Sequence, residues 1–503
     1  MTFAMANVML ACAEPGGPVV YRRREPEKTV LYQCVARYWP AFLAHAEQCD
    51  RPVPKFVRRE FETFLDCGLA ERGAIRVRCP ACGFDRLVAF SCKSSICPSC
   101  CGRRMTEFAA HLVDHVLPAI AIRQWVLTLP PPLRYLLAYD SRLCSDVLRI
   151  FIGRVFSFLR QSAKTKLGLR RLNQAHPGAI VALQRFGSAA NLNIHAHVLV
   201  SDGLFVANGD SGTLTFQALP APTDAQIQHI AWTTCERVVA LLRKRGQWLD
   251  ADPEADRLSQ DEPLLASLYS ASITGTLAMG PRAGKRLLRL VEAPVRQSDG
   301  HENGSRNGYG FDLHAGVRVA ASDKNHLERL CRYLCRPAIS NERVKQLPDG
   351  KFALVLKRPF KDGTSAIVLS GEELIEKLVA LIPPPRFHMT RAYGVWASHA
   401  KLRPQVIPKR AAQGAAGSDC EHEHRDTEVK RPSSFSWAAL MRRAFAIDVL
   451  TCSRCGARMQ KIAVITKPAV IRAILPSIAR NTGPPRHPMP RPTQHRPEAP
   501  PAV

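Results

Sequence analysis

The sequence of 503 residues predicts an α+β protein built from several structural units. Two segments, AIVALQRFG (179–187) and NIHAHVLVSDG (193–203), read as β-strands. A third segment, HLERLCRYLCR (326–336), repeats its apolar residues at helical spacing. Because a single core rarely extends over so long a chain, about two to four units are expected.

The charge balance indicates a nucleic-acid partner. The chain has 70 basic and 43 acidic residues, which gives a formal net charge of +27, and an excess of this size attracts polyanions. An anionic membrane surface is the competing partner. It would require a basic amphipathic helix or a polybasic segment beside an apolar one, and the sequence has neither. No run of about eighteen uncharged apolar residues occurs, so no membrane-spanning helix is expected.

The cysteines indicate a reducing compartment. Several of the 17 cysteines form close Cys-x-x-Cys pairs, a pattern typical of reduced thiolates that bind zinc in the cytoplasm. The apolar start MTFAMANVMLAC has no basic region before it, which argues against a secretion signal. We therefore expect a cytoplasmic protein that associates with the bacterial nucleoid.

Shifts in composition divide the chain into six predicted segments. These are a basic helical segment at 1–60, a zinc ribbon at 61–105, a mixed α and β region at 106–403, a polar linker at 404–435, a small helical unit with a Cys-x-x-Cys pair at 436–480, and a proline-rich, disordered tail at 481–503.

The zinc ribbon is predicted from two cysteine pairs separated by fourteen residues. Zinc prefers four soft ligands in a tetrahedron, and each Cys-x-x-Cys turn supplies two thiolates. Between the pairs, FDRLVAFS alternates enough to form a short hairpin. The predicted ligands are Cys79, Cys82, Cys97 and Cys100, although Cys92 or Cys101 could replace one of them. Arg103 and Arg104 follow the second pair, where they could contact DNA phosphates.

A further pair, Cys452 and Cys455, has no obvious partner pair. Cys420, His422 and His424 could complete a second zinc site from the linker. A half-site, or a turn without zinc, explains the pair equally well.

Two histidines one residue apart are weak evidence alone, and the chain has two such pairs, His195/His197 and His422/His424. The second lies in the charged segment EHEHRD, where histidines are normally solvated. The alternation of the first places His195, His197 and Leu199 on one face of a strand. Two imidazoles so placed can bind a divalent cation and leave positions open for a phosphate oxygen. A hydrogen-bonded structural pair is the alternative.

The predicted helix at 322–336 carries a tyrosine at the border of its apolar face. Ser322 is suited to cap its start, and Pro337 ends it. The apolar stripe consists of Leu327, Leu330, Cys331 and Leu334. Arg329 and Arg336 lie one turn from Tyr333 on either side, and two guanidiniums can hold a phosphate for attack by the phenol. A tyrosine at the edge of a core, among surface arginines, is the alternative.

Four segments occur together in one known family. They are NLNIHAHVLVSDG, LERLCRYLCRPAIS, LKRPFKDGTSAIVLSGEELIEKLVALIPPPRFH and RVRCPACGFDRLVAFSCKSSICPSCCGRR. In their order the chain resembles the rolling-circle transposases of the insertion-sequence-91 family, which belong to the HUH (His-hydrophobic-His) endonucleases. The resemblance covers most of residues 60–475. It implies a ferredoxin-like palm, an antiparallel sheet with packed helices, which follows the zinc ribbon and displays the histidine strand at its centre.

The resemblance also implies a chemistry. His195 and His197 would hold Mg²⁺ or Mn²⁺, and Tyr333 would attack single-stranded DNA at the transposon ends. The products would be a 5′-phosphotyrosine and a free 3′-OH, with later joining to target DNA. The founding type of the family has two tyrosines four residues apart, but Arg329 occupies the second position here. This resembles the single-tyrosine branch, in which the tyrosine is reused, or a second subunit or the 3′-OH performs the second step.

A third metal ligand is expected, because two imidazoles alone bind a hard cation poorly. Gln184 in VALQRFG and His314 in FDLHAGVRV are the candidates. Both are expected on strands beside the histidine strand, and Gln184 is preferred because its short connection to His195 suggests a hairpin.

Two other functions compete with this interpretation. A plasmid replication initiator or relaxase shares the histidine strand and the tyrosine, but the N-terminal ribbon and the absence of a GxxxxGK[ST] phosphate loop argue against it. A zinc-ribbon DNA-binding regulator explains the charge and the cysteines, but it leaves the histidine strand and the tyrosine helix unexplained. A decayed copy of the element, folded but inactive, is a third alternative.

Overall fold

The structure is a computed structural model that describes residues 24–208, 212–247, 256–291, 304–306, 310–408, 437–445 and 448–481. The chain forms two compact units. The first consists of Met1–Pro26, Asp66–Ser91 and Ser434–Val503, and the second of Glu27–Leu65 and Cys92–Ser433. Most of the predicted linker and nearly all of the predicted tail lie outside the described residues. No described helix is long and apolar enough to cross a membrane.

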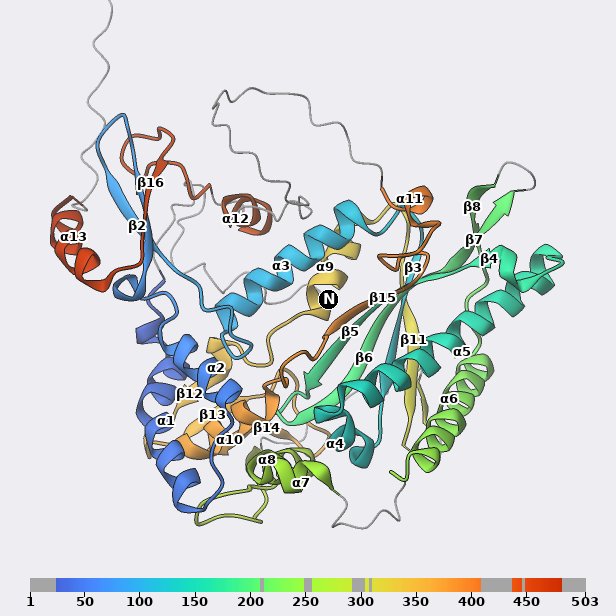
Figure 1. Ribbon diagram of the computed structural model, residues 1–503, viewed down its shortest axis with the longest axis horizontal. Helices are drawn as coiled ribbons and strands as arrows, with labels where there is room; N and C mark the ends of the chain where they lie inside the picture. Colours follow the sequence, from blue (N-terminus) through green and yellow to red (C-terminus); the bar gives the residue numbers. More distant parts are fainter. Residues whose placement is uncertain are drawn as a thin grey trace, which may run out of the picture. The chain divides into compact units, whose positions relative to one another are not determined.

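The second unit is built around a six-stranded antiparallel sheet (Figure 1). The strands, in order across the sheet, are β10 (Gly304–Arg306), β11 (Asp312–Val319), β3 (Ile122–Thr128), β6 (Leu192–Ser201), β5 (Gly178–Phe186) and β15 (Thr390–Gly394). The two strands predicted from the sequence are β5 and β6, which pair antiparallel as a hairpin. Because β3 flanks β6 on its other side, the histidine strand lies inside the sheet.

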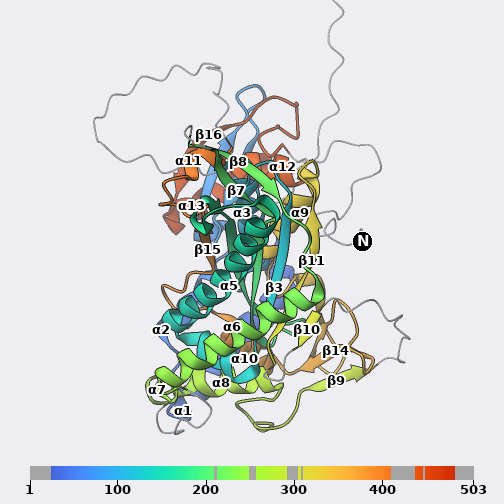
Figure 2. The ribbon, with the colours of Figure 1, turned by 90° about the vertical axis from the view of Figure 1, so that its right-hand side faces the viewer.

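Helices cover both faces of this sheet (Figure 1, Figure 2). They are α3 (Pro98–His115) and α9 (Lys324–Leu334) on one face, and α4 (Pro131–Tyr139) and α5 (Ser141–Leu167) on the other. The first pair shares a hydrophobic core with Ile180, Ala182 and Leu199 of the sheet. On the opposite face Trp125 of β3 meets Phe158 of α5, with ring centroids 6.4 Å apart. This combination of antiparallel sheets and helices agrees with the predicted α+β class.

Two smaller sheets complete the second unit. One contains β12 (Val344–Gln346), β13 (Phe352–Val355), β14 (Thr364–Leu369) and β9 (Leu288–Val291), and the other contains β4 (Ala175–His176), β7 (Gly203–Asn208) and β8 (Thr213–Ala218). The remaining helices are α1 (Val30–Gln48), α2 (Lys55–Leu65), α6 (Asp224–Lys244), α7 (Arg257–Asp261), α8 (Pro263–Thr274), α10 (Gly371–Leu381) and α11 (Arg403–Val406). Trp39 of α1 stacks on Phe61 of α2 at 4.0 Å between ring centroids.

The first unit contains a three-stranded antiparallel sheet made from two distant parts of the chain. Its strands are β16 (Gln460–Ile465), β1 (Ala74–Arg78) and β2 (Asp85–Ala89), and its helices are α12 (Trp437–Phe445) and α13 (Pro468–Asn481). The segment FDRLVAFS was expected to form a hairpin by itself. It instead contributes the single strand β2, because its pairing partner β1 lies before the first cysteine pair.

Candidate active site and metal centres

The histidine pair lies on β6 at the centre of the sheet. His195 is opposite Gln184 of β5 and Thr128 of β3 in the antiparallel register. The imidazole centroids of His195 and His197 are 4.9 Å apart, as expected for alternate residues on one face of a strand. Leu199, the next residue on this face, contributes to the core that contains α9. The face that carries the histidines is therefore the face that carries the tyrosine helix.

Hydrogen bonds at Nδ1 orient both imidazoles. The Nδ1 of His195 lies 2.9 Å from the carbonyl oxygen of Asn193, to which it can donate. The Nδ1 of His197 lies 3.0 Å from the side-chain amide of Gln124 on β3. As placed, the amide nitrogen Nε2 of Gln124 faces Nδ1 and donates to it; if the amide is turned over, its oxygen accepts from Nδ1–H and Nε2 of the imidazole keeps its lone pair. The Nε2 of His197 is buried and has no hydrogen-bond partner among the described residues, so this nitrogen could serve as a metal ligand.

Burial keeps both imidazoles neutral. Desolvation lowers the pKa of His195 to about 4, and the charges of Arg336 and Arg134 act in the same direction, against the hydrogen bond that the ring donates to the Asn193 carbonyl. Desolvation, the neighbouring His195 and Arg336 lower the pKa of His197 to about 3. Near pH 7 each ring is therefore uncharged, which is the form that donates a lone pair to a metal.

Tyr333 lies against the histidine pair. Its ring meets the ring of His197 at 90°, with centroids 5.5 Å apart, and its side chain is 38% exposed. The guanidinium carbon of Arg336 lies 4.7 Å from the centroid of the Tyr333 ring. The four residues of the predicted apolar stripe are all buried, which confirms the helix and its orientation. The predicted cap was wrong by one residue, because the side chain of Asp323, not Ser322, accepts from the N–H of His326.

Gln184 holds the end of the tyrosine helix. Its amide nitrogen donates to the carbonyl oxygens of Tyr333 at 2.9 Å and Leu334 at 3.1 Å. Its amide oxygen accepts from Nε of Arg336 at 3.3 Å. The last carbonyls of a helix have no partner within the helix, and Gln184, only 1% exposed, supplies one. The side chain lies on the histidine face, but its contacts are those of a residue that positions Tyr333.

His314 is farther from the histidine pair than expected. It lies opposite Val126 on β3, and Val126 lies opposite His197 on β6. One whole strand therefore separates the two histidines, or about 10 Å at the usual spacing between strands. The prediction that both candidate ligands would be on strands adjacent to β6 was wrong for His314, because β3 pairs between β11 and β6. Of the two candidates, the structure brings only Gln184 next to the pair.

Three of the four predicted DNA-contacting arginines lie on helices of the second unit, and the fourth, Arg336, follows the end of α9. Arg103 and Arg104 lie on α3 and Arg329 lies on α9, all three exposed. Arg104 also donates to the carbonyl oxygen of Ser94 at 3.2 Å. Arg336 is half-buried beside Tyr333. All four side chains remain candidates for phosphate contacts.

The structure separates the cysteines that the sequence spacing had grouped. The thiols of Cys79 and Cys82 form a group with Cys452 and Cys455, all within 4.8 Å of one another. In the second unit, Cys97 and Cys100 instead lie with Cys92, and the Sγ atoms of Cys92 and Cys100 are 3.6 Å apart. The prediction of one zinc site from Cys79, Cys82, Cys97 and Cys100 was therefore wrong. The suggested partners of the C-terminal pair, Cys420, His422 and His424, lie outside the described residues.

The backbone around Cys97 and Cys100 explains why this pair does not join Cys79 and Cys82. Cys97 is the residue before α3, Pro98 is its first residue, and Cys100 lies in its first turn. This pair is therefore part of a helix start and not a zinc-ribbon turn. A signal in the sequence distinguishes the pairs, since Gly83 follows Cys82 directly and Gly456 follows Cys455 directly. Gln124 was also missed, and no spacing rule points to it, because its role depends on the pairing of β3 with β6.

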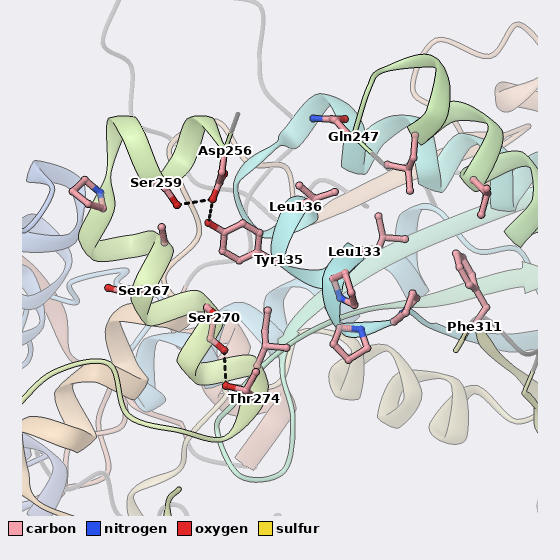
Figure 3. A pocket seen from close by; sticks show the side chains of 18 of the residues that line it. Leu133, Tyr135, Leu136, Gln247, Asp256, Ser259, Ser267, Ser270, Thr274 and Phe311 are labelled. Atoms are coloured by element: carbon pink, nitrogen blue, oxygen red, sulfur yellow. Dashed lines mark hydrogen bonds between the residues drawn. The ribbon is translucent and has the colours of Figure 1, made fainter. Parts of the chain in front are cut away.

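A pocket of about 1120 Å³ opens in the second unit between α4, α6 and α8 (Figure 3). Its wall is mostly apolar and includes Leu133 and Phe311. The hydroxyl of Tyr135 donates to Oδ2 of Asp256 at 2.5 Å, and the hydroxyl of Ser259 donates to the same oxygen at 2.6 Å. Neither the histidine pair nor the tyrosine of α9 lines this pocket, so it is distinct from the candidate active site.

Two models of known families match the chain. A family model described as "Putative transposase" matches residues 178–403, and another, described as "Transposase zinc-binding domain", matches residues 34–129. No curated protein and no solved structure matches the chain. The antiparallel sheet, the cysteine groups and these matches define a DNA-processing enzyme with a zinc-binding region. The chain belongs to the insertion-sequence-91 family of transposases.

Proposed function

We propose that this transposase cleaves and rejoins single-stranded DNA through Tyr333, and that its six-stranded sheet is the ferredoxin-like palm of an HUH endonuclease. One observation carries the proposal. The ring of Tyr333 lies edge-on to His197, whose Nε2 is buried and without a partner among the described residues. A histidine pair with a purely structural role would be expected to have its buried ring nitrogens satisfied.

The residues present fit a divalent cation. His195 and His197 are neutral, and the Nδ1 atom of each ring is engaged in a hydrogen bond. The Nε2 atoms are therefore the ones that could donate a lone pair to a metal ion. Mg²⁺ or Mn²⁺ held there would polarise a phosphate oxygen of the DNA. Gln184 is the candidate for a third protein ligand by its place opposite His195, and His314 is the weaker candidate because a strand intervenes.

Tyr333 supplies the nucleophile in the proposed reaction. Its phenol oxygen forms a bond to phosphorus, the bond from phosphorus to the 3′-oxygen breaks, and the proton of the phenol is balanced by the one that the 3′-hydroxyl gains. The 5′-phosphotyrosine keeps the energy of the phosphodiester, so rejoining to target DNA needs no nucleotide triphosphate. Arg336 over the ring can donate to the phosphate, while Gln184 fixes the helix end that carries the tyrosine.

The site contains a single tyrosine, so the second strand transfer needs another arrangement. Tyr333 is reused, or a second subunit contributes its own tyrosine, or the freed 3′-OH attacks the phosphotyrosine. An oligomer is required only by the second of these. The DNA partners are the single-stranded transposon ends and the target.

Incubation with labelled single-stranded DNA from the element's ends tests the proposal. With Mg²⁺ or Mn²⁺ the protein should form an adduct that protease treatment removes on a denaturing gel, and EDTA should prevent it. Tyr333→Phe should abolish the adduct and leave DNA binding nearly unchanged, because only one hydroxyl is lost. The matched control is Tyr38→Phe in α1, whose ring contacts Phe352. An adduct that persists in Tyr333→Phe would identify the nucleophile as another residue.

The same experiment separates the competing functions. A zinc-ribbon regulator without catalysis, or a decayed copy, would bind DNA and give no adduct on any strand. A replication initiator or relaxase would give the adduct at a plasmid origin and not at the transposon ends. The family matches favour the transposase.

A further inference from the structure

We propose that Cys79, Cys82, Cys452 and Cys455 bind one zinc ion, which closes a ribbon assembled from two distant segments of the chain. The Sγ atoms of Cys79 and Cys455 are 3.5 Å apart, and those of Cys82 and Cys452 are 3.6 Å apart. All four lie within 4.8 Å of one another. Four soft thiolates at such separations suit tetrahedral zinc, and a closed set of four leaves no position for a catalytic water.

The two cysteine pairs lie in turns of the same shape. In the first, the N–H of Gly83 donates to the carbonyl oxygen of Cys79 at 2.9 Å; in the second, Gly456 donates to Cys452 at 3.0 Å. Both glycines have positive φ angles, +70° and +74°, a conformation in which other residues are strained. A 2.8 Å hydrogen bond closes each turn: the N–H of Cys79 donates to the carbonyl oxygen of Phe84, and the N–H of Cys452 donates to that of Ala457. Two such turns facing each other present their thiolates to one ion.

The strands and side chains of the first unit support the same assembly. The C-terminal strand β16 pairs along β1, from Ala74 opposite Ile465 to Arg78 opposite Gln460. Around the thiols the buried core is small, with Val77, Phe84 and Met459 as its members apart from two of the cysteines. A core of this size supplies little stability, and small domains commonly depend on a structural metal for the rest.

The proposed zinc site would tie the C-terminal segment to the N-terminal region. Cys452 and Cys455 lie outside both matched regions, 34–129 and 178–403, and Cys82 and Cys452 are 370 residues apart in sequence. The zinc ion therefore makes the C-terminal segment part of the ribbon that the N-terminal region begins. We expect the N-terminal turn and the C-terminal turn to lose their order together when the ion is removed.

Thiol alkylation of the native full-length chain tests this without any substitution. Cys82 and Cys455 are exposed, as is Cys49, which belongs to neither group of thiols. Exposure alone would let all three react with iodoacetamide at similar rates. With zinc bound, Cys82 and Cys455 should react far more slowly than Cys49, and both should become reactive at the same chelator concentration. Reaction as fast as that of Cys49 before chelation, or release at clearly different chelator concentrations, would overturn the proposal.

Metal content provides the second measurement. Cys79→Ser/Cys82→Ser and Cys452→Ser/Cys455→Ser should each lower the zinc content by about one ion per chain, with Cys49→Ser as the control that loses none. The quadruple variant should lose no more than either double variant, because both pairs hold the same ion. A quadruple loss twice as large, no loss from the C-terminal pair, or iron in place of zinc contradicts the proposed site.

Discussion

Replacing Gln184 tests how the tyrosine is positioned. In Gln184→Leu the carbonyl oxygens of Tyr333 and Leu334 lose hydrogen bonds of 2.9 and 3.1 Å. Each such bond contributes about 1 kcal/mol net, so the helix end loses about 2 kcal/mol of its anchoring. If the reactive placement of Tyr333 depends on that anchoring, adduct formation slows by roughly thirtyfold at about 1.4 kcal/mol per tenfold. DNA affinity should change little, since Gln184 is buried.

Gln184→Glu separates positioning from metal ligation. A carboxylate only accepts hydrogen bonds, so it cannot donate to the two helix carbonyls, and we expect a loss of rate similar to that in Gln184→Leu. If Gln184 were instead mainly a metal ligand, the harder carboxylate would preserve or tighten Mg²⁺ binding and keep the rate. The assay is single-turnover adduct formation at saturating DNA, with Mn²⁺ affinity measured in parallel and Gln161→Leu, exposed on α5, as the control. A glutamate variant with the wild-type rate would refute the positioning role.

Three further substitutions give distinct results. Gln124→Leu removes the partner of His197 Nδ1, so the affinity for the metal should fall by about 10- to 100-fold. Excess Mn²⁺ should then restore cleavage. A loss of cleavage that excess metal does not restore would contradict the role of Gln124 in orienting His197. Arg336→Lys removes the planar cation over Tyr333 and should slow adduct formation by roughly tenfold; an unchanged rate would show that the stacking is unimportant. Arg329→Ala, on the exposed side of α9, should weaken DNA binding and lower the slope of log affinity against log salt by about one, and an unchanged slope would place Arg329 away from the phosphates.

Local patterns were sufficient for the strands and the helix of the active site. Both β5 and β6 were predicted from the sequence, and the alternation of β6 placed His195 and His197 on one face, because the side chains of a strand alternate whatever its neighbours are. The helical spacing of the apolar residues in α9 placed Tyr333 at the border between core and solvent, because the helical period fixes which residues share a face. Neither pattern reports which strands pair, and the wrong expectation for His314 follows directly from that limit.

The contacts that the sequence did not reveal are those between distant segments. The spacing of Cys79, Cys82, Cys97 and Cys100 resembles a ribbon, yet the first pair meets cysteines near the other end of the chain. Nothing in local spacing measures such a contact, although the glycine that follows each true turn is a usable signal. The role of Gln124 could not be predicted for the same reason. The hydrogen-bond partner of a buried polar residue in an apolar strand is known only when the neighbouring strand is known.

Peptide mapping of the protein–DNA adduct determines whether Tyr333 becomes covalently joined to DNA. The protein would be incubated with single-stranded transposon-end DNA and Mg²⁺, the DNA trimmed with nuclease, and the protein digested and analysed by mass spectrometry. We expect a nucleotide attached through its 5′-phosphate to the peptide that contains Tyr333, and to no other peptide. Attachment at a different residue, or adduct formation that EDTA does not prevent, would contradict it.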